Sequence, residues 1–155
     1  MVCDKANSKD TFQVKLIDGN MGDKVPAILG MQASCDMLGG FYYDGKGVRQ
    51  SYKKAFQYRK KACDFGYGES CFWAGRAYYD GKGVQKDLKT ALKFFTKSCE
   101  LKDGVGCAMV GAFYYDGDEV VKQNFSTAKE LYGKACDFGE QRGCDEYKKL
   151  KENGY

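Results

Sequence analysis

Eight cysteines are the side chains of this sequence whose type and spacing carry the most chemistry. Six of them form three pairs whose members are eight positions apart: Cys63 and Cys71, Cys99 and Cys107, Cys136 and Cys144. Thiols placed in this way form disulfides, bind a metal ion or stay as buried free thiols. Zinc sites usually use Cys-x-x-Cys pairs and often His, and this chain of 155 residues has neither. We therefore favour disulfides, which require an oxidising compartment.

Two Ser-x-x-Lys motifs, at residues 51–54 and 126–129, match the first element of a serine β-lactamase. Such an enzyme also needs a Lys-Thr-Gly element, and the nearest stretch is Lys-Thr-Ala at residues 89–91. Ser51 and Ser126 both lie where a helix is predicted to begin, and serine is a common N-cap there. A chain without His has no Ser-His triad. We expect no catalytic residue, no cofactor and no metal.

The elements that position the cysteines recur along the chain. The first cysteines of successive pairs are 36 and 37 residues apart, and Tyr-Tyr-Asp-Gly occurs at residues 42–45, 78–81 and 114–117. Self-similarity at this period is typical of a solenoid, in which each helical unit buries its apolar face against the next unit. The sequence therefore predicts an all-α, α/α solenoid of helix-turn-helix repeats.

We expect one solenoid domain over residues 1–155. Its parts are an irregular N-terminal segment (1–25), three repeats (26–63, 64–99 and 100–136) and a C-terminal capping half-repeat (137–155). Residues 10–18 alternate like a strand, but a lone strand has no sheet to join, so we prefer a short helix there. The expected first helices of the repeats are 26–43, 70–79 and 106–115, the second helices are 51–63, 87–99 and 126–136, and the capping helix is 142–151. Asp118-Glu119 and one extra residue predict an altered third turn without a break in stacking.

Each cysteine pair spans a helix-to-helix junction. The first cysteine ends one helix, and the second lies in the first turns of the next, so a short reversing loop brings their Cα atoms into bonding range. Each bridge closes a small loop, so we expect it to add about 2 kcal/mol to the free energy of unfolding, at the low end of the usual range for a disulfide. Cys35 has Ala27 at the position of its expected partner. If residues 10–18 fold back along the first helix, Cys3 comes within reach, so we expect a Cys3–Cys35 bridge.

These motifs resemble a known family. The pattern Leu/Ala-Gly-x-x-Tyr-Tyr-x-Gly-x-Gly-Val, followed by Lys-x-Ala-x-x-aromatic-x-x-Lys-Ala/Ser-Cys, resembles the Sel1-like repeat, a relative of the tetratricopeptide repeat. The paired cysteines look like the disulfide-bridged branch typified by the Helicobacter cysteine-rich proteins. The resemblance covers residues 26–150. Some bridged relatives have been described as penicillin-binding or weakly β-lactamase-like, so it also implies that activity as an alternative function.

Composition excludes several classes of partner. The formal charge is +4, with 25 basic against 21 acidic residues, which is too small and dispersed an excess to indicate nucleic acid binding. No run of 18 apolar residues is present, so we expect no membrane insertion. No secretory leader is visible. Because disulfides indicate a secreted or periplasmic protein, we expect that its leader has been removed. We also expect a monomer.

The resemblance to tetratricopeptide units implies a concave groove that binds a peptide or protein segment. Side chains one step from the packed helix face are expected to line it: Asp36, Tyr43, Asp44, Phe72, Arg76, Tyr79, Asp80, Tyr115 and Asp116. Tyrosines suit an extended peptide, and Arg76 can bind a carboxylate or a carbonyl. Alternatively, the second tyrosine of each pair only covers the neighbouring turn. A further candidate function is an immunity protein that neutralises a toxin.

Overall fold

The computed structural model describes Cys3 and residues 31–155, and these residues contain seven α-helices and no strand. The helices are α1 (Met31–Asp44), α2 (Tyr52–Asp64), α3 (Gly68–Asp80), α4 (Leu88–Glu100), α5 (Gly104–Asp116), α6 (Phe125–Asp137) and α7 (Gln141–Glu152). The predicted helix at residues 10–18 and the predicted start of the first repeat at residue 26 lie outside the described residues.

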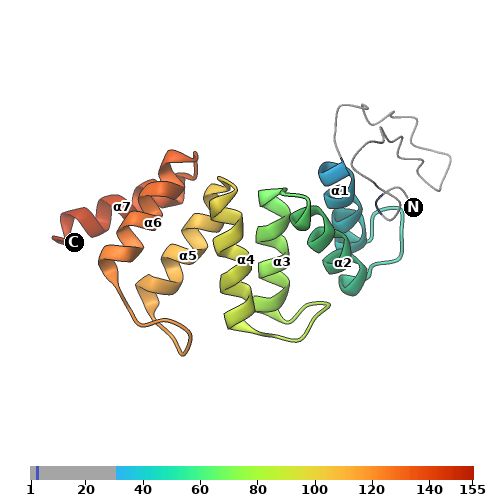
Figure 1. The fold of residues 1–155 in the computed structure, drawn as a ribbon, viewed down its shortest axis with the longest axis horizontal. Helices are drawn as coiled ribbons and strands as arrows, with labels where there is room; N and C mark the ends of the chain where they lie inside the picture. The colour runs from blue at the N-terminus through green and yellow to red at the C-terminus, as the bar shows by residue number, and fades with distance from the viewer. Residues whose placement is uncertain (1–2, 4–30) are drawn as a thin grey trace.

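The helices follow one another along the long axis of the molecule, with α1 and α7 at opposite ends (Figure 1). Each helix packs against the next one in the chain, and α5 also touches α3 and α7, its counterparts in the neighbouring units. We call α1, α3, α5 and α7 the A-helices, and α2, α4 and α6 the B-helices. The predicted solenoid of helix-turn-helix repeats, stapled by disulfides, is confirmed.

The turn of each repeat is closed by the residue that caps its B-helix. The caps are Ser51, Asp87 and Asn124, and each side chain accepts a hydrogen bond from the backbone N–H three residues later. Their own backbone N–H groups donate to the carbonyls of Tyr42, Tyr78 and Tyr114 at 2.9, 3.0 and 2.7 Å. Helix α6 begins at Phe125, one residue before the predicted start, but the expectation that Ser126 is its N-cap was wrong, because Asn124 is the cap and Ser126 lies within the first turn.

Glycine allows the two helices of each repeat to approach closely. A Cβ atom on Gly75 would lie 2.9 Å from the ring of Phe95, and one on Gly111 would lie 3.0 Å from the ring of Tyr132. In the first repeat, a Cβ on Gly39 would lie 2.5 Å from Cγ of Arg59. The same B-helix position therefore fills the same space in all three repeats, with an aromatic ring twice and an arginine once.

Disulfides join each B-helix to the A-helix that follows it. The bridges Cys63–Cys71, Cys99–Cys107 and Cys136–Cys144 have Cα–Cα distances of 4.6, 4.4 and 4.5 Å. Cys3 is bridged to Cys35 of α1, with a Cα–Cα distance of 5.3 Å. These are the four pairs expected from the sequence, and together they contain all eight cysteines.

The third turn differs from the other two without separating its helices. Asp118 accepts hydrogen bonds from the backbone N–H groups of Val120 and Val121, and its own N–H donates to the carbonyl of Val121. This loop accommodates the extra residue. Gln123 then donates to the carbonyl of Tyr115 at 2.9 Å, as Gln50 donates to that of Tyr43 at 2.8 Å in the first repeat.

Within the described part of the chain, no helix has the length and apolar character needed to cross a membrane. The same residues contain no group of three or more His, Cys, Asp or Glu side chains arranged to hold a metal ion.

Candidate binding site

The paired tyrosines at the end of each A-helix have different surroundings. Tyr79 and Tyr115, which we predicted to line a groove, keep 38% and 39% of their surface exposed. Tyr43, the third predicted member, is half-buried because its ring packs against Tyr52 at 5.2 Å and Trp73 at 6.1 Å. Of the preceding tyrosines, Tyr42 is buried, and those at positions 78 and 114 are half-buried.

Several of the charged residues predicted to line the groove are already paired on the protein. Nε of Arg76 donates to the carboxylate of Asp80 at 2.8 Å, one helical turn away, and its guanidinium lies 6.0 Å from the ring centroid of Tyr79. Asp44 pairs with Lys46 at 3.3 Å. Arg76 and Asp80 therefore form a preassembled polar pair beside an exposed tyrosine.

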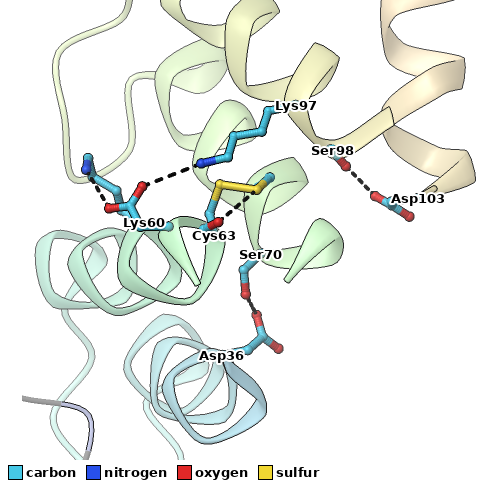
Figure 2. Close-up of a disulfide and its surroundings, with 9 residues drawn as sticks. Asp36, Lys60, Cys63, Ser70, Lys97, Ser98 and Asp103 are labelled. Carbon is cyan, nitrogen blue, oxygen red and sulfur yellow. Dashed lines mark hydrogen bonds and ion pairs between the residues drawn. A yellow bond between two sulfur atoms is a disulfide. The ribbon is translucent and has the colours of Figure 1, made fainter. Parts of the chain in front are cut away.

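Asp36 and Phe72, also predicted for the groove, take part in contacts between helices. The carboxylate of Asp36 accepts a hydrogen bond of 2.6 Å from the hydroxyl of Ser70, across the junction between the first two repeats (Figure 2). Phe72 packs against the buried ring of Phe95 at 5.8 Å. Tyr115 packs against Phe125 at 5.3 Å, and Asp116 beside it is exposed.

Figure 2 also shows polar contacts around the disulfide of Cys63 and at the junction that follows. Asp64, next to Cys63, forms ion pairs with Lys60 of its own helix at 3.0 Å and with Lys97 of α4 at 3.8 Å. At the next junction, the buried hydroxyl of Ser98 donates to Asp103 at 2.6 Å. The Lys97–Asp64 and Ser98–Asp103 contacts help to join successive repeats.

A small pocket lies where α1, α2 and α3 meet the turn after α3. It is lined by Tyr43, Tyr52, Ala55, Phe56, Arg59, Trp73, Arg76, Ala77, Asp80 and Lys82. Its free space is about 20 Å³, little more than one water molecule requires. Three of the ten lining residues, Tyr43, Arg76 and Asp80, belong to the predicted groove set. We call this feature the Arg59 pocket.

Arg59 is the unusual residue of this pocket. Its side chain is about nine-tenths buried, and Nε is the one buried side-chain nitrogen or oxygen in the described residues without a hydrogen-bond partner. Its guanidinium carbon lies 4.4 Å from the ring centroid of Trp73 and 5.2 Å from that of Tyr43. Burial lowers the pKa of Arg59, and the negative charge of Asp36 offsets part of this effect.

Lys82 extends over the pocket from the turn after α3. Its ammonium lies 5.7 Å from the ring centroid of Tyr43 and 5.4 Å from that of Tyr52, and it donates to the hydroxyl of Tyr43 at 3.4 Å. The hydrogen bond to Tyr43 raises the pKa of Lys82. With Arg59 and Arg76 it gives the pocket three positive charges against the single negative charge of Asp80.

The sequence interpretation did not assign Arg59, Trp73, Tyr52 or Lys82 to a site. A signal for Arg59 was present, because its positions in the later repeats hold Phe95 and Tyr132. Burial raises the pKa of Tyr132 to about 12, as expected for a phenol within the core. An arginine in a series of core aromatics is a departure that alignment of the repeats exposes.

The Ser-x-x-Lys motifs are explained by helix structure. The Oγ atom of Ser51 accepts the backbone N–H of Lys54 at 3.3 Å, which is the N-cap bond of α2. Ser126 is an exposed residue in the first turn of α6. Neither arrangement supplies an observation in favour of a β-lactamase-like function.

Comparison with known families and structures agrees with the repeat pattern. The Sel1 repeat model matches residues 32–67, 68–103 and 104–139. No curated protein matches the sequence of this chain.

Three solved structures have similar folds. A Sel1 repeat protein from Oxalobacter formigenes is 25% identical with a TM-score of 0.70, over 75% of this chain and 47% of its own. A protective antigen present in uropathogenic Escherichia coli strains, displaying an SLR fold, is 30% identical with a TM-score of 0.73, over 81% of this chain and 27% of its own. Cysteine rich protein B of Helicobacter pylori is 28% identical with a TM-score of 0.61, over 74% of this chain and 95% of its own. This chain thus spans less than half the length of the first two.

Proposed function

Because this chain belongs to the Sel1 repeat family, we propose that it is a non-enzymatic module that binds an extended peptide segment of a partner protein. Sel1 repeats generally mediate protein–protein interactions. The segment lies along the A-helix ends, in a concave groove that includes Tyr43, Tyr79 and Tyr115.

The observation that carries this proposal is the recurrence of an aromatic residue with exposed surface at the same place in successive repeats. Tyr79 and Tyr115 are more than one-third exposed, although each also contacts a neighbouring ring. A tyrosine held in this way presents a rigid apolar surface with a polar tip, which is a common binding hot spot. The Arg76–Asp80 pair beside Tyr79 supplies donors and acceptors for a peptide backbone.

We also propose that the protein functions in a secreted or periplasmic setting. Four disulfides suggest an extracytoplasmic protein, because thiols are kept reduced in most cytosols.

Selection from a random peptide display library tests the binding function. The disulfide-intact chain is immobilised, the selected peptides are synthesised, and their affinities are measured by calorimetry. Tyr79→Ala should weaken them at least about tenfold, because truncating a hot-spot aromatic costs on the order of 2 kcal/mol. Lys93→Ala is the matched control, because Lys93 is an exposed residue of α4 outside the predicted groove. Peptides that bind Tyr79→Ala as tightly as the unchanged protein would contradict the proposed site.

A further inference from the structure

Arg59 occupies a position that the other two repeats fill with a core aromatic. Phe95 and Tyr132 lie at the corresponding places in α4 and α6, 0% and 6% exposed, each against an A-helix glycine. Arg59 is packed against Gly39 in the same way and is only 9% exposed. Burying a guanidinium is costly unless its charge is paired and its N–H groups are bonded. The first repeat therefore holds a cation where an apolar ring would stabilise the fold.

The protein itself does not satisfy this cation. Oδ1 of Asp36 is 4.0 Å from Nε of Arg59, which balances charge but is too long for a hydrogen bond. That same oxygen already accepts the hydroxyl of Ser70 at 2.6 Å. Nε of Arg59 has no other partner. A buried N–H without an acceptor is rare in proteins, and a bound anion is one way to satisfy it.

We propose that the Arg59 pocket binds a carboxylate carried by the partner's peptide segment. The rings of Trp73 and Tyr43 lie close to the guanidinium, and its Nε–H has no acceptor on the protein. A carboxylate matches the fork of N–H donors on arginine. Lys82 and Arg76 add positive charge at the same pocket.

The size of the pocket limits what enters it. Free space of about 20 Å³ admits one small polar group and excludes an aromatic side chain. A carboxylate oxygen is a group of this size. The apolar part of the residue that carries the carboxylate then rests on Tyr52 and Tyr43, whose rings lie at the pocket. This inference rests on the proposed function and names the chemical group that the module recognises.

Titration of the ¹⁵N-labelled, disulfide-intact chain tests the proposal, with the Nε–H signal of Arg59 as the readout. The probes are N-acetylphenylalanine, which has a terminal carboxylate, and N-acetyl-glutamyl-phenylalaninamide, which has a side-chain carboxylate. N-acetylphenylalaninamide has no carboxylate and is the control. At least one acid should shift the Arg59 signal to saturation and bind at least about tenfold more tightly than the control, since hydrogen bonds to charged groups are the stronger class. The tighter acid shows whether a chain end or an acidic side chain is the source.

Three variants separate binding from folding. Arg59→Phe copies the second repeat, so it should fold while weakening whichever acid binds the unchanged protein at least about tenfold, as followed through the indole N–H of Trp73. Arg59→Lys keeps the charge but loses the fork of donors, and should also bind at least about tenfold more weakly. It provides the test if Arg59→Phe is not folded. Arg142→Met removes an exposed arginine of α7 and should bind like the unchanged protein.

A response to the amide equal to that of both acids, or no shift of the Arg59 signal with either acid, overturns the proposal. Inorganic phosphate that binds more tightly than both acids overturns the assignment to a carboxylate. The peptides selected above separate this inference from the proposed function. If they all bind Arg59→Phe unchanged but require Tyr79, the module binds peptides and the carboxylate site is wrong. If no peptide requires Tyr79 while the acids still bind at Arg59, the carboxylate site stands without the groove.

Discussion

Two consecutive residues at the end of α3, Tyr78 and Tyr79, differ in how much the fold depends on them. The ring of Tyr78 packs against Phe56 at 5.2 Å and Phe94 at 5.5 Å, so it joins α3 to the B-helices on both sides. Tyr79 contacts rings only at 6.0 Å or more and is 38% exposed. Tyr78 is therefore a packing residue, and Tyr79 has surface to spare for a partner.

Tyr78→Ala should lower the free energy of unfolding by about 2 to 3 kcal/mol, somewhat less than for a fully buried aromatic. Tyr79→Ala should change it by less than about 1 kcal/mol, as is usual for exposed positions. Urea unfolding of the oxidised chain, followed by circular dichroism, measures both. If Tyr79→Ala proves the more damaging, its ring serves the fold, and the proposed binding surface loses its central residue.

At the residue scale, the sequence predicted positions better than it predicted surroundings. The repeat pattern identified which tyrosine of each pair is the more exposed, because adjacent side chains on a helix point about 100° apart. It did not predict that Asp36 is bonded to Ser70, or that Arg59 lies among Tyr43 and Trp73. Those contacts join residues 34, 16 and 14 positions apart in the chain, and they depend on how the helices pack against one another. A local sequence pattern contains no information on that packing.

The turns provide a matched test at the scale of elements. Gly47 and Gly83 are equivalent residues of the first two turns, with φ of +70° and +77°. A Cβ atom on Gly47 would meet nothing within 4 Å, whereas one on Gly83 would lie 2.2 Å from the carbonyl oxygen of Tyr52. Both positions require the left-handed backbone. Only Gly83 also has no room for a side chain, because its turn lies directly on the start of α2.

Gly47→Ala should cost about 1 to 2 kcal/mol, which is the penalty of a left-handed backbone on a residue with a side chain. Gly83→Ala should cost at least about 1 kcal/mol more, because a backbone oxygen cannot move away as a flexible side chain can. Thermal unfolding of the two variants measures the difference. Equal losses would mean that the turn after α3 does not rest on α2, and the placement of Lys82 over Tyr43 and Tyr52 would be wrong with it.

Most element boundaries were predictable within two residues, because caps and glycines punctuate them. Ser51 and Asp87 mark the starts of α2 and α4 as caps, and Asp44 and Asp80 end their helices one residue beyond the predicted limits. The predicted start of α3 at residue 70 was late by two, since the helix begins at Gly68. Glycine is a poor helix former, so propensity alone does not place it in a first turn. Contact with Leu101 and Asp103 of the next junction surrounds this glycine closely.

At the scale of the molecule, the described chain is a row of repeats whose hydrophobic cores differ in composition. The middle of the row has a core of Phe95, Phe113, Val110 and Ala91. The core of the first repeat contains Tyr42, Tyr58 and two small alanines, with Arg59 where the middle repeat has its largest fully buried side chain, Phe95. In a solenoid, each unit is stabilised by its own packing and by its nearest neighbours. The first repeat should therefore be less stable than the middle repeat.

Native-state hydrogen exchange on the oxidised chain measures this gradient directly. Amides of α2 should exchange faster than those of α4, because local opening of the first repeat disrupts less apolar packing. Arg59→Phe should then slow exchange in α2 about tenfold or more, since replacing a buried ion by an apolar residue of suitable shape often stabilises by about 1 to 4 kcal/mol.

The same variant should leave exchange in α6 unchanged, because α2 and α6 belong to repeats that are not neighbours, and α3, α4 and α5 lie between them along the molecule (Figure 1). Slower exchange in every helix would instead show that the solenoid opens as one cooperative unit. Faster exchange in α2 would show that Arg59 stabilises the repeat through Asp36, Trp73 and Tyr43, in which case its burial needs no ligand to explain it. The variant that removes the carboxylate site is thus expected to make the first repeat more stable, so that binding and stability change in opposite directions at one residue.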